Sequence, residues 1–311
     1  MQRNKKLGYG WEAIPPGGPM DIVEDTRAEV SAEPQGGAAR VQSGAWLLEL
    51  SPDWIVCRAS ENIHRLLGES HVTLIDEPFG KFVHAQPLHD LRNLFSRLSG
   101  TTGIARAYRV RLTDDPDLVD IAFQQSDDRL ILEAVPSPDE RLGEALGAVG
   151  GLAAGLARET RGTLLDAAAR RMRALTSFDR VTLLLDGSKS TSSRTGVPFR
   201  SGANETLSDD LPMIVPNSAA TSISIFPHHD EDSAVAAALL KAPTAGQATE
   251  LNDRGFASTM RVPVVLNGEK IGEFRLAHTT ARRPSFELHA AAELFAQLFA
   301  LRLEIDRLKN R

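Results

Sequence analysis

The chain has 311 residues, 24% of them charged, and a formal net charge of −6 at pH 7. A chain of this length is expected to form about two domains, each with its own core. The acidic balance argues against a dedicated nucleic-acid-binding protein, which would present a basic patch or stripe. The longest apolar stretches fall far short of the roughly 20 residues that a membrane-spanning helix needs, and no secretory leader opens the chain. These observations predict a cytoplasmic protein without a nucleic-acid or membrane partner.

The sequence contains one cysteine, Cys57. A single thiol cannot form an internal disulfide or a multi-thiolate metal site, and its presence fits a reducing compartment. Because Cys57 falls inside a predicted strand, a buried small hydrophobic side chain is its expected role.

The sequence pattern of the first part of the chain predicts an arm followed by a small domain of helices and strands. Residues 1–40 contain Gly- and Pro-rich stretches and an acidic patch without a sustained period, which is typical of a flexible arm. Two short helices are expected, one capped by Ser60 and ended by Gly68, and one over 88–98. Runs of strand length flank these helices, at 46–50, 54–57, 106–112, 118–124 and 130–135.

The second part begins with helices and ends in a hairpin. A helical stretch from about Asp139 is expected to be broken or kinked near Gly150-Gly151 and again at 160–162. Leu164 to Leu175 then carries apolar residues at three- and four-residue steps and leads into an apolar strand at Val181 to Leu185. Further on, Asn267-Gly268 between two strand-like runs, 258–266 and 269–278, is the strongest short signal for a two-residue hairpin.

The last helix is predicted to begin after Ser285, as its cap, and to carry a heptad seam. Such a seam favours pairing with a second copy of the chain. The alternative is that its first half packs on the protein's own sheet while the second half frays, and the sequence leaves both open. The seam residues are Ala291, Leu294, Leu298, Leu301, Ile305 and Leu308.

These elements, in this order, resemble the PAS and GAF photosensory pair of bacterial phytochromes over residues 41–309. The resemblance is strongest where Leu175-Thr176-Ser177-Phe178-Asp179-Arg180-Val181 joins a helix to a strand, and it extends to Ala59–Gly68 and the Asn-Gly hairpin. It implies an α+β fold with a PAS-like domain over 41–136 and a GAF-like domain over 137–311. Each domain would have a central antiparallel sheet flanked by helices, and a long C-terminal helix would end the chain.

The resemblance also locates a pigment pocket, which this sequence matches poorly. The family attaches a linear tetrapyrrole to a cysteine in the arm, and residues 1–40 contain none, so covalent attachment is not expected. Aromatic or histidine positions of the family hold Leu184, Glu250 and Ala277 here. The remaining candidates for cofactor contacts are Asp210 (for the family's Asp-Ile-Pro aspartate), Lys241 (for a propionate-binding arginine), Gln247 (for a histidine near the rings) and His278 (for the second of two consecutive histidines).

Other polar groups give no catalytic or metal site. His228 to Asp232 is dense in metal-capable side chains, but neighbours on an extended segment point in alternating directions, so a solvated loop is expected. Asp209 and Asp210 lack a base, nucleophile or glycine-rich phosphate loop nearby, and a turn is expected. The segment between Phe226 and Gln247 is shorter than the lasso through which the family's arm threads, so the formation of a full knot stays open. No enzymatic activity is predicted.

Three functions follow from the resemblance. The first is a sensory or regulatory module without a catalytic output domain, acting as a homodimer through the C-terminal helix or through a protein signalling partner. The second is a photoreceptor with non-covalently bound biliverdin, contacted by Asp210, Lys241 and His278. The third is a GAF receptor for another small ligand, such as a cyclic nucleotide or haem, because one fold serves many ligands.

Overall fold

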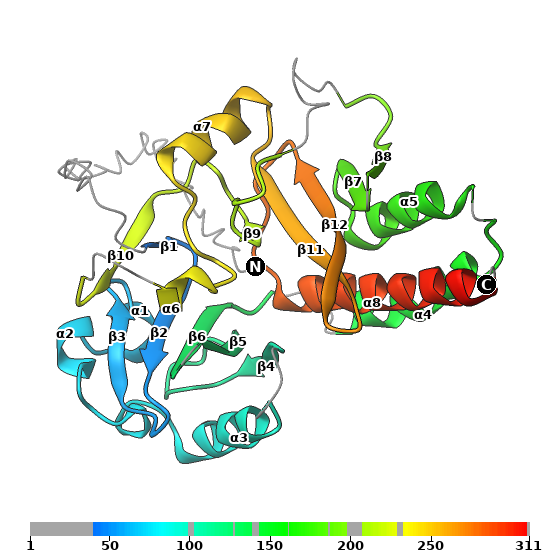
Figure 1. The fold of residues 1–311 in the computed structure, drawn as a ribbon. Coiled ribbons are helices and arrows are strands. Elements are labelled where there is room, and N and C mark those ends of the chain that lie inside the picture. The colour runs from blue at the N-terminus through cyan, green and yellow to red at the C-terminus, as the bar shows by residue number, and fades with distance from the viewer. Residues whose placement is uncertain are drawn as a thin grey trace, which may run out of the picture. The chain divides into compact units, whose positions relative to one another are not determined.

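The computed structural model describes residues 40–98, 103–126, 128–138, 143–160, 162–185, 187–197, 207–228 and 233–309. Two antiparallel sheets, each accompanied by helices, organise this part of the chain (Figure 1). The predicted α+β class is confirmed, including the long last helix. The predicted flexible arm, residues 1–40, lies outside the described residues except for Arg40.

The first sheet has seven strands in the order β1-β10-β3-β2-β6-β5-β4. Short helices and α3 lie against it, and its main core combines Trp54, Phe79 and Phe123 with aliphatic side chains. The strands are β1 (Arg40–Gln42), β2 (Trp46–Leu50), β3 (Val56–Ser60), β4 (Ala105–Val110), β5 (Val119–Ser126), β6 (Arg129–Pro136) and β10 (Ser222–Phe226). The helices are α1 (His64–Leu67), α2 (His71–Leu74), the 3-10 turn η1 (Phe79–Lys81) and α3 (Ala85–Ser96).

Two predictions in this half are corrected. Ser60 does not cap a helix, because it is the last residue of β3 and its Oγ accepts a hydrogen bond from the Leu47 N–H at 3.1 Å. Gly68 does end α1, in the left-handed conformation. Cys57 is partly rather than fully buried, and its Sγ lies 2.9 Å from Nη1 of Arg129. Burial nevertheless raises the pKa of the Cys57 thiol, so it is mostly protonated at neutral pH.

The second sheet has five strands in the order β8-β7-β12-β11-β9. Helices α5 and α8 pack on one of its faces, α4 packs on these two helices, and together they form a large apolar core with the sheet. The strands are β7 (Arg180–Leu185), β8 (Ser188–Ser193), β9 (Ile214–Val215), β11 (Ser258–Leu266) and β12 (Glu269–His278). The helices are α4 (Glu144–Leu156), α5 (Leu164–Thr176), α7 (Ala245–Asp253) and α8 (Phe286–Lys309), whereas the short helix α6 (Ser233–Ala236) contacts β5 and β6 of the first sheet.

The helix α4 runs through Gly150-Gly151 without a break, which corrects the predicted interruption. Each glycine costs roughly 1 kcal/mol of helix propensity, but Val149 and Leu156 are buried in the core that α4 shares with α8. In Figure 1 α4 and α8 lie side by side. Tertiary packing therefore overrides the local signal.

The hairpin and the start of the last helix form as predicted. Asn267 and Gly268 have φ values of 52° and 83°, the positive values that a two-residue hairpin turn requires. The Oγ of Ser285 accepts a hydrogen bond from the Leu288 N–H at 3.2 Å, which caps α8.

The strand β10 links the two halves of the chain, because it lies in the first sheet between β1 and β3. On the edge of β1 that does not face β10, β1 meets the backbone of residues 240–242. There the Ala242 N–H donates a hydrogen bond to the Arg40 carbonyl at 2.7 Å. The side chain of Gln42 also donates to the Ile214 carbonyl at 2.7 Å. The segment 214–242 thus borders β1 on both edges, while the residues that would thread a knot lie outside the described part.

Two buried polar contacts fasten the first sheet to the second half of the chain. The Glu133 carboxylate, 1% exposed, accepts hydrogen bonds from the backbone N–H groups of Leu239 and Leu240 at 2.8 and 2.7 Å. Arg106 on β4 donates from Nη2 to His289 Nδ1 at 2.9 Å and to Glu293 Oε2 at 2.7 Å, both on α8. The PAS-like strands therefore contact the C-terminal helix directly.

Candidate functional site

The face of the second sheet that points away from α5 and α8 is the candidate site, and we call it the outer face. Strand alternation assigns its residues: Phe274 and Leu276 belong to the helix-side core, whereas Glu273, Arg275 and Ala277 point the other way. Several of the family's pocket positions therefore fall on or beside the outer face. These include Leu184, which pairs with Glu273, and Ala277 itself.

A buried charged cluster occupies the outer face. Arg261 holds the Glu273 carboxylate through two hydrogen bonds, from Nη2 at 2.8 Å and from Nε at 3.2 Å, and Arg275 Nε adds a third at 2.8 Å. The side chains of Glu273, Arg275 and Arg261 are 3%, 7% and 11% exposed. Because Arg261 and Arg275 are directly opposite each other on neighbouring strands, the two like charges need the carboxylate between them.

The charged cluster also holds a covering segment over the sheet. Arg261 Nη1 donates to the Leu211 carbonyl at 2.6 Å, and Arg275 donates to the Leu207 carbonyl and to the Asp209 carboxylate. Beside these contacts lies a small apolar cluster that fills the space between this segment, α7 and the sheet. Its members are Leu207, Leu211, Val215, Leu251, Phe256 and Ala277.

A cavity of about 660 Å³ remains next to the charged cluster, at the turn between β7 and β8. Its described lining includes Lys189, Lys270 and Asp209 together with the cluster itself, and none of the described lining residues is aromatic. A conjugated tetrapyrrole needs aromatic walls and unengaged cations for its carboxylates. The volume is adequate, and the described walls are charged and aliphatic.

The four predicted cofactor residues do not converge. Two of them meet: Gln247 Nε2, on α7, donates to the backbone carbonyl of Asp210 at 3.0 Å, and the Asp210 side chain is exposed. Gln247 also forms a capping box with Thr244. Both the oxygen and the nitrogen of the Gln247 amide therefore form hydrogen bonds within the protein. The expected turn at Asp209 and Asp210 is present.

Lys241 and His278 lie elsewhere. Lys241 forms a β-bridge with Val41, and its carbonyl accepts a hydrogen bond from the Gln42 side chain at 3.2 Å. His278 points to the helix side of the sheet, where its Nδ1 lies 2.8 Å from Oδ2 of Asp179. The predicted set is thus divided between the two faces of the sheet and β1.

The side chains that dominate the outer face, Arg261, Glu273 and Arg275, were missed by sequence reasoning. A signal for them exists, because charged residues alternate with Phe274 and Leu276 along β12. Alternation alone normally predicts a solvent-facing side of a strand. Only the register that sets Arg261 against Arg275 reveals a buried cluster.

The C-terminal helix carries an exposed apolar stripe. Leu294, Leu301, Ile305 and Leu308 are 40%, 57%, 47% and 56% exposed. Ala291, at the start of the predicted seam, is buried in the core of the second sheet. Ala291 and the partly buried Leu298 therefore serve the protein's own core, whereas Leu294 and the positions from Leu301 onward lie on the surface of α8.

Among the described residues, no group of three or more His, Cys, Asp or Glu side chains is placed to hold a metal ion. The dense segment at His228 is described only in part, because residues 229–232 lie outside the described ranges. None of the helices in the described ranges combines the length and the apolar character needed to cross a bilayer.

Comparison with known proteins identifies the fold. A family profile described as a PAS fold matches residues 38–137. The structure matches the chromophore-binding domain of an unusual bacteriophytochrome from R. palustris with a TM-score of 0.66 and 19% identity, covering 88% of this chain and 96% of that one. The chromophore-binding domain of a Stigmatella aurantiaca phytochrome gives a TM-score of 0.66 and 21% identity, covering 84% and 95%.

A longer structure, the photosensory core module of the Stigmatella aurantiaca phytochrome, gives a TM-score of 0.69 and 20% identity. It is matched over 86% of this chain and 58% of its own length. No curated protein matches the chain in sequence. At these identities the matches establish the fold, which is the one that the sequence resemblance implied.

Proposed function

Since the described chain has the PAS–GAF fold of bacteriophytochrome chromophore-binding domains, we propose that it is a sensory or regulatory module of that type without a covalently bound bilin. It has no catalytic role in this proposal and passes its signal through a homodimer or to a protein partner. The observation that carries the proposal is the buried charged cluster on the outer face, where the pigment pocket of the family is expected.

The cluster opposes a pigment on energetic grounds. Arg261 and Arg275 could bind propionate groups only by releasing Glu273, which would leave a carboxylate that is 3% exposed with the half-exposed Lys270 as its remaining ionic partner. Breaking a buried ion pair in this way costs about 3 to 5 kcal/mol. Each unpaired polar group of the ligand would add about 1 to 3 kcal/mol. A tetrapyrrole would therefore bind weakly at this face.

The contacts of α8 support a role for this helix in transmission. His289 is fully buried and lies between Arg106 of the first sheet and the backbone carbonyl of Arg261, which is 3.3 Å from its Nε2. Burial lowers the pKa of His289, so the ring is neutral at pH 7, with Nδ1 accepting from Arg106 and Nε2 donating. A displacement of the outer face or of the first sheet would thus act on α8.

Dimerisation through the exposed stripe of α8 is the second part of the proposal. The substitution Leu301→Glu is expected to convert a dimer into a monomer at tens of micromolar, because Leu301 is 57% exposed in one copy and its burial is worth about 1.5 to 3 kcal/mol per side chain. Size-exclusion chromatography with light scattering measures the change. Since the side chain lies on the surface, the melting temperature of the variant monomer should stay close to that of a monomeric wild-type sample.

Arg307→Glu is the matched control, because Arg307 lies on the same helix outside the apolar stripe and its side chain is 59% exposed. It should leave the dimer intact. A wild-type chain that is monomeric at these concentrations, or a Leu301→Glu variant that remains dimeric, would remove the dimer from the proposal.

A photoreceptor with non-covalently bound biliverdin is the alternative, because two predicted pocket positions, Gln247 and Asp210, are neighbours in the structure through the Asp210 backbone carbonyl. In this alternative Lys241 would contact a propionate. Lys241→Ala would then weaken biliverdin binding, and unchanged binding would exclude the contact.

A further inference from the structure

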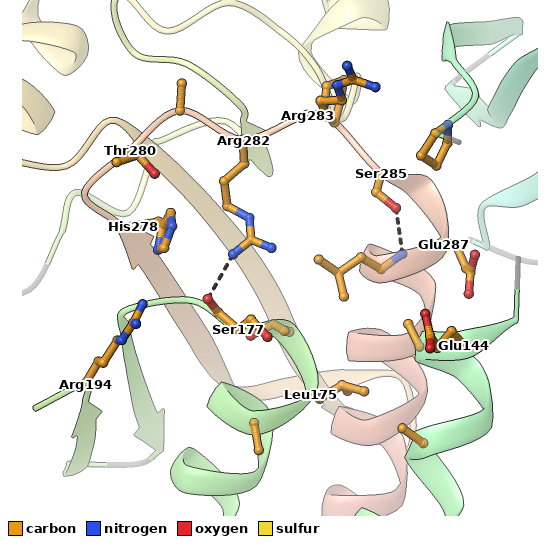
Figure 2. Close-up of a pocket in the computed structure, with 18 of the residues that line it drawn as sticks. Glu144, Leu175, Ser177, Arg194, His278, Thr280, Arg282, Arg283, Ser285 and Glu287 are labelled. Atoms are coloured by element: carbon orange, nitrogen blue, oxygen red, sulfur yellow. Dashed lines mark hydrogen bonds between the residues drawn. The ribbon is translucent and has the colours of Figure 1, made fainter. Parts of the chain in front are cut away.

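A second cavity lies on the helix side of the second sheet, away from the outer face. It has a volume of about 1100 Å³ and opens between α4, the end of α5 and the loop that joins β12 to α8 (Figure 2). This volume is slightly above the roughly 300 to 1,000 Å³ that small-molecule sites occupy. The family resemblance assigns no ligand to it, because the expected pigment contacts other than His278 lie elsewhere.

One end of the cavity is cationic. Arg282 stacks over the ring of Phe178 at 4.6 Å, and its Nη1 donates to the Ser177 carbonyl at 2.9 Å, so its guanidinium is fixed at the wall. Arg194 reaches the same end with a side chain that is 65% exposed, 3.7 Å from the Asp179 carboxylate. Figure 2 shows Arg194, Arg282 and His278 gathered at this end.

Among the described residues, the carboxylate beside these cations is that of Asp179, and it already has partners. Oδ2 of Asp179 accepts hydrogen bonds from the N–H and hydroxyl of Thr279 at 3.0 and 2.8 Å and lies 2.8 Å from Nδ1 of His278. Although burial alone would raise it, the pKa of Asp179 is held below its usual value by these bonds and by the neighbouring cations. Burial lowers the pKa of His278, so its ring is neutral at pH 7. Among the described residues at this end, the guanidinium groups of Arg194 and Arg282 therefore stand against one carboxylate.

Beyond the cationic end, the wall of the cavity is apolar, and two carboxylates lie at the opposite end. Ala145, Ala148 and Leu152 recur at three- and four-residue steps on α4, so one face of this helix lines the wall together with Leu175 and Leu288. Glu144 and Glu287 lie at the end opposite His278 and Arg194 in Figure 2. Arg283 also lines the cavity and offsets part of this acidic charge. An anion is nevertheless favoured at the end that holds Arg194 and Arg282, where its head group would meet two guanidinium groups.

We propose that this cavity binds a small organic anion with an apolar body, its carboxylate or phosphate lying between Arg194 and Arg282 and its hydrocarbon part lying along α4. Two guanidinium groups suit either head group, because each presents paired N–H donors to two oxygens. The alanines of α4 leave the width that a hydrocarbon chain needs. Binding here would place the ligand against α4, α5 and α8, the helices that form an apolar core with the second sheet.

The test uses octanoate, octyl phosphate and the neutral octanamide, added to the full chain. At least one of the two anions should raise the melting temperature in a concentration-dependent way, and octanamide should not. Arg194→Glu should weaken the binding of that anion by about tenfold or more, because it reverses a head-group contact. Arg111→Glu is the matched control, since Arg111 is an exposed residue of the first half and makes the same change in net charge.

The position of the ligand is checked by the imidazole resonance of His278, assigned with a His278→Gln variant, which should shift on titration with the binding anion. Failure of both anions to bind, equal binding of octanamide, or an Arg194→Glu variant that binds as tightly as Arg111→Glu would each overturn the proposal. Because this cavity and the outer face lie on opposite sides of the sheet, a biliverdin experiment has no bearing on the result.

Discussion

Glu273→Ala is expected to destabilise the protein by about 3 to 5 kcal/mol, the largest effect among the single substitutions considered. The substitution removes the carboxylate that lies between Arg261 and Arg275 and leaves two guanidinium groups at 11% and 7% exposure without their shared partner. The guanidinium groups would then repel each other across neighbouring strands. Urea unfolding, followed by far-UV circular dichroism, measures the loss.

Two variants separate burial from charge in this experiment. Lys270→Ala removes another partner of Glu273, but its side chain is 50% exposed, so a loss below about 1 kcal/mol is expected. Replacing the whole cluster by apolar residues (Arg261→Met, Glu273→Leu and Arg275→Met together) should recover most of the stability lost in Glu273→Ala. A Glu273→Ala variant that loses no more than Lys270→Ala would show that the cluster is not buried as described.

The second large effect is a pH dependence from Glu133. Burial raises the pKa of Glu133 from its ordinary 4.5 to about 7, with the N–H groups of Leu239 and Leu240 partly offsetting the shift. Between these pH values the folded state holds a proton that the unfolded state has released, so stability falls as pH rises through this window. A pKa shift of this size lowers the free energy of unfolding by about 3 kcal/mol between pH 4.5 and pH 8.

Glu133→Gln should remove this dependence, because the amide does not titrate. Between pH 4.5 and pH 8, the free energy of unfolding measured with urea is expected to fall by about 3 kcal/mol more for wild type than for the variant. The control Glu69→Gln alters an exposed carboxyl and should follow the wild-type profile. Parallel profiles for wild type and Glu133→Gln would mean that Glu133 is ionised in the folded state over the whole range.

Local signals in the sequence predicted most of the second sheet and its helices. The apolar steps of 164–175 and the Asn-Gly turn act over a few residues, and both α5 and the β11–β12 hairpin form where those signals lie. The position of β10 could not be predicted in this way. It pairs with β1, with Arg40 opposite Ser224, and that pairing depends on the fold of the whole chain.

The candidate site was harder to predict than the fold. Asp210, Lys241, Gln247 and His278 were chosen by position in a family pattern, and that pattern does not report which face of the sheet each side chain takes. His278 and Ala277 are neighbours in the chain but lie on opposite faces. The cluster of Arg261, Glu273 and Arg275 arises from strand register, which fixes contacts between residues that no short motif connects.

The most direct test of the proposed function is an absorption spectrum of the purified chain mixed with biliverdin, taken after gel filtration and again after red and far-red illumination. The charged cluster on the outer face predicts that no pigment elutes with the protein and that illumination changes nothing. A red absorption band that elutes with the protein and converts under light would contradict the proposal and establish a non-covalent photoreceptor.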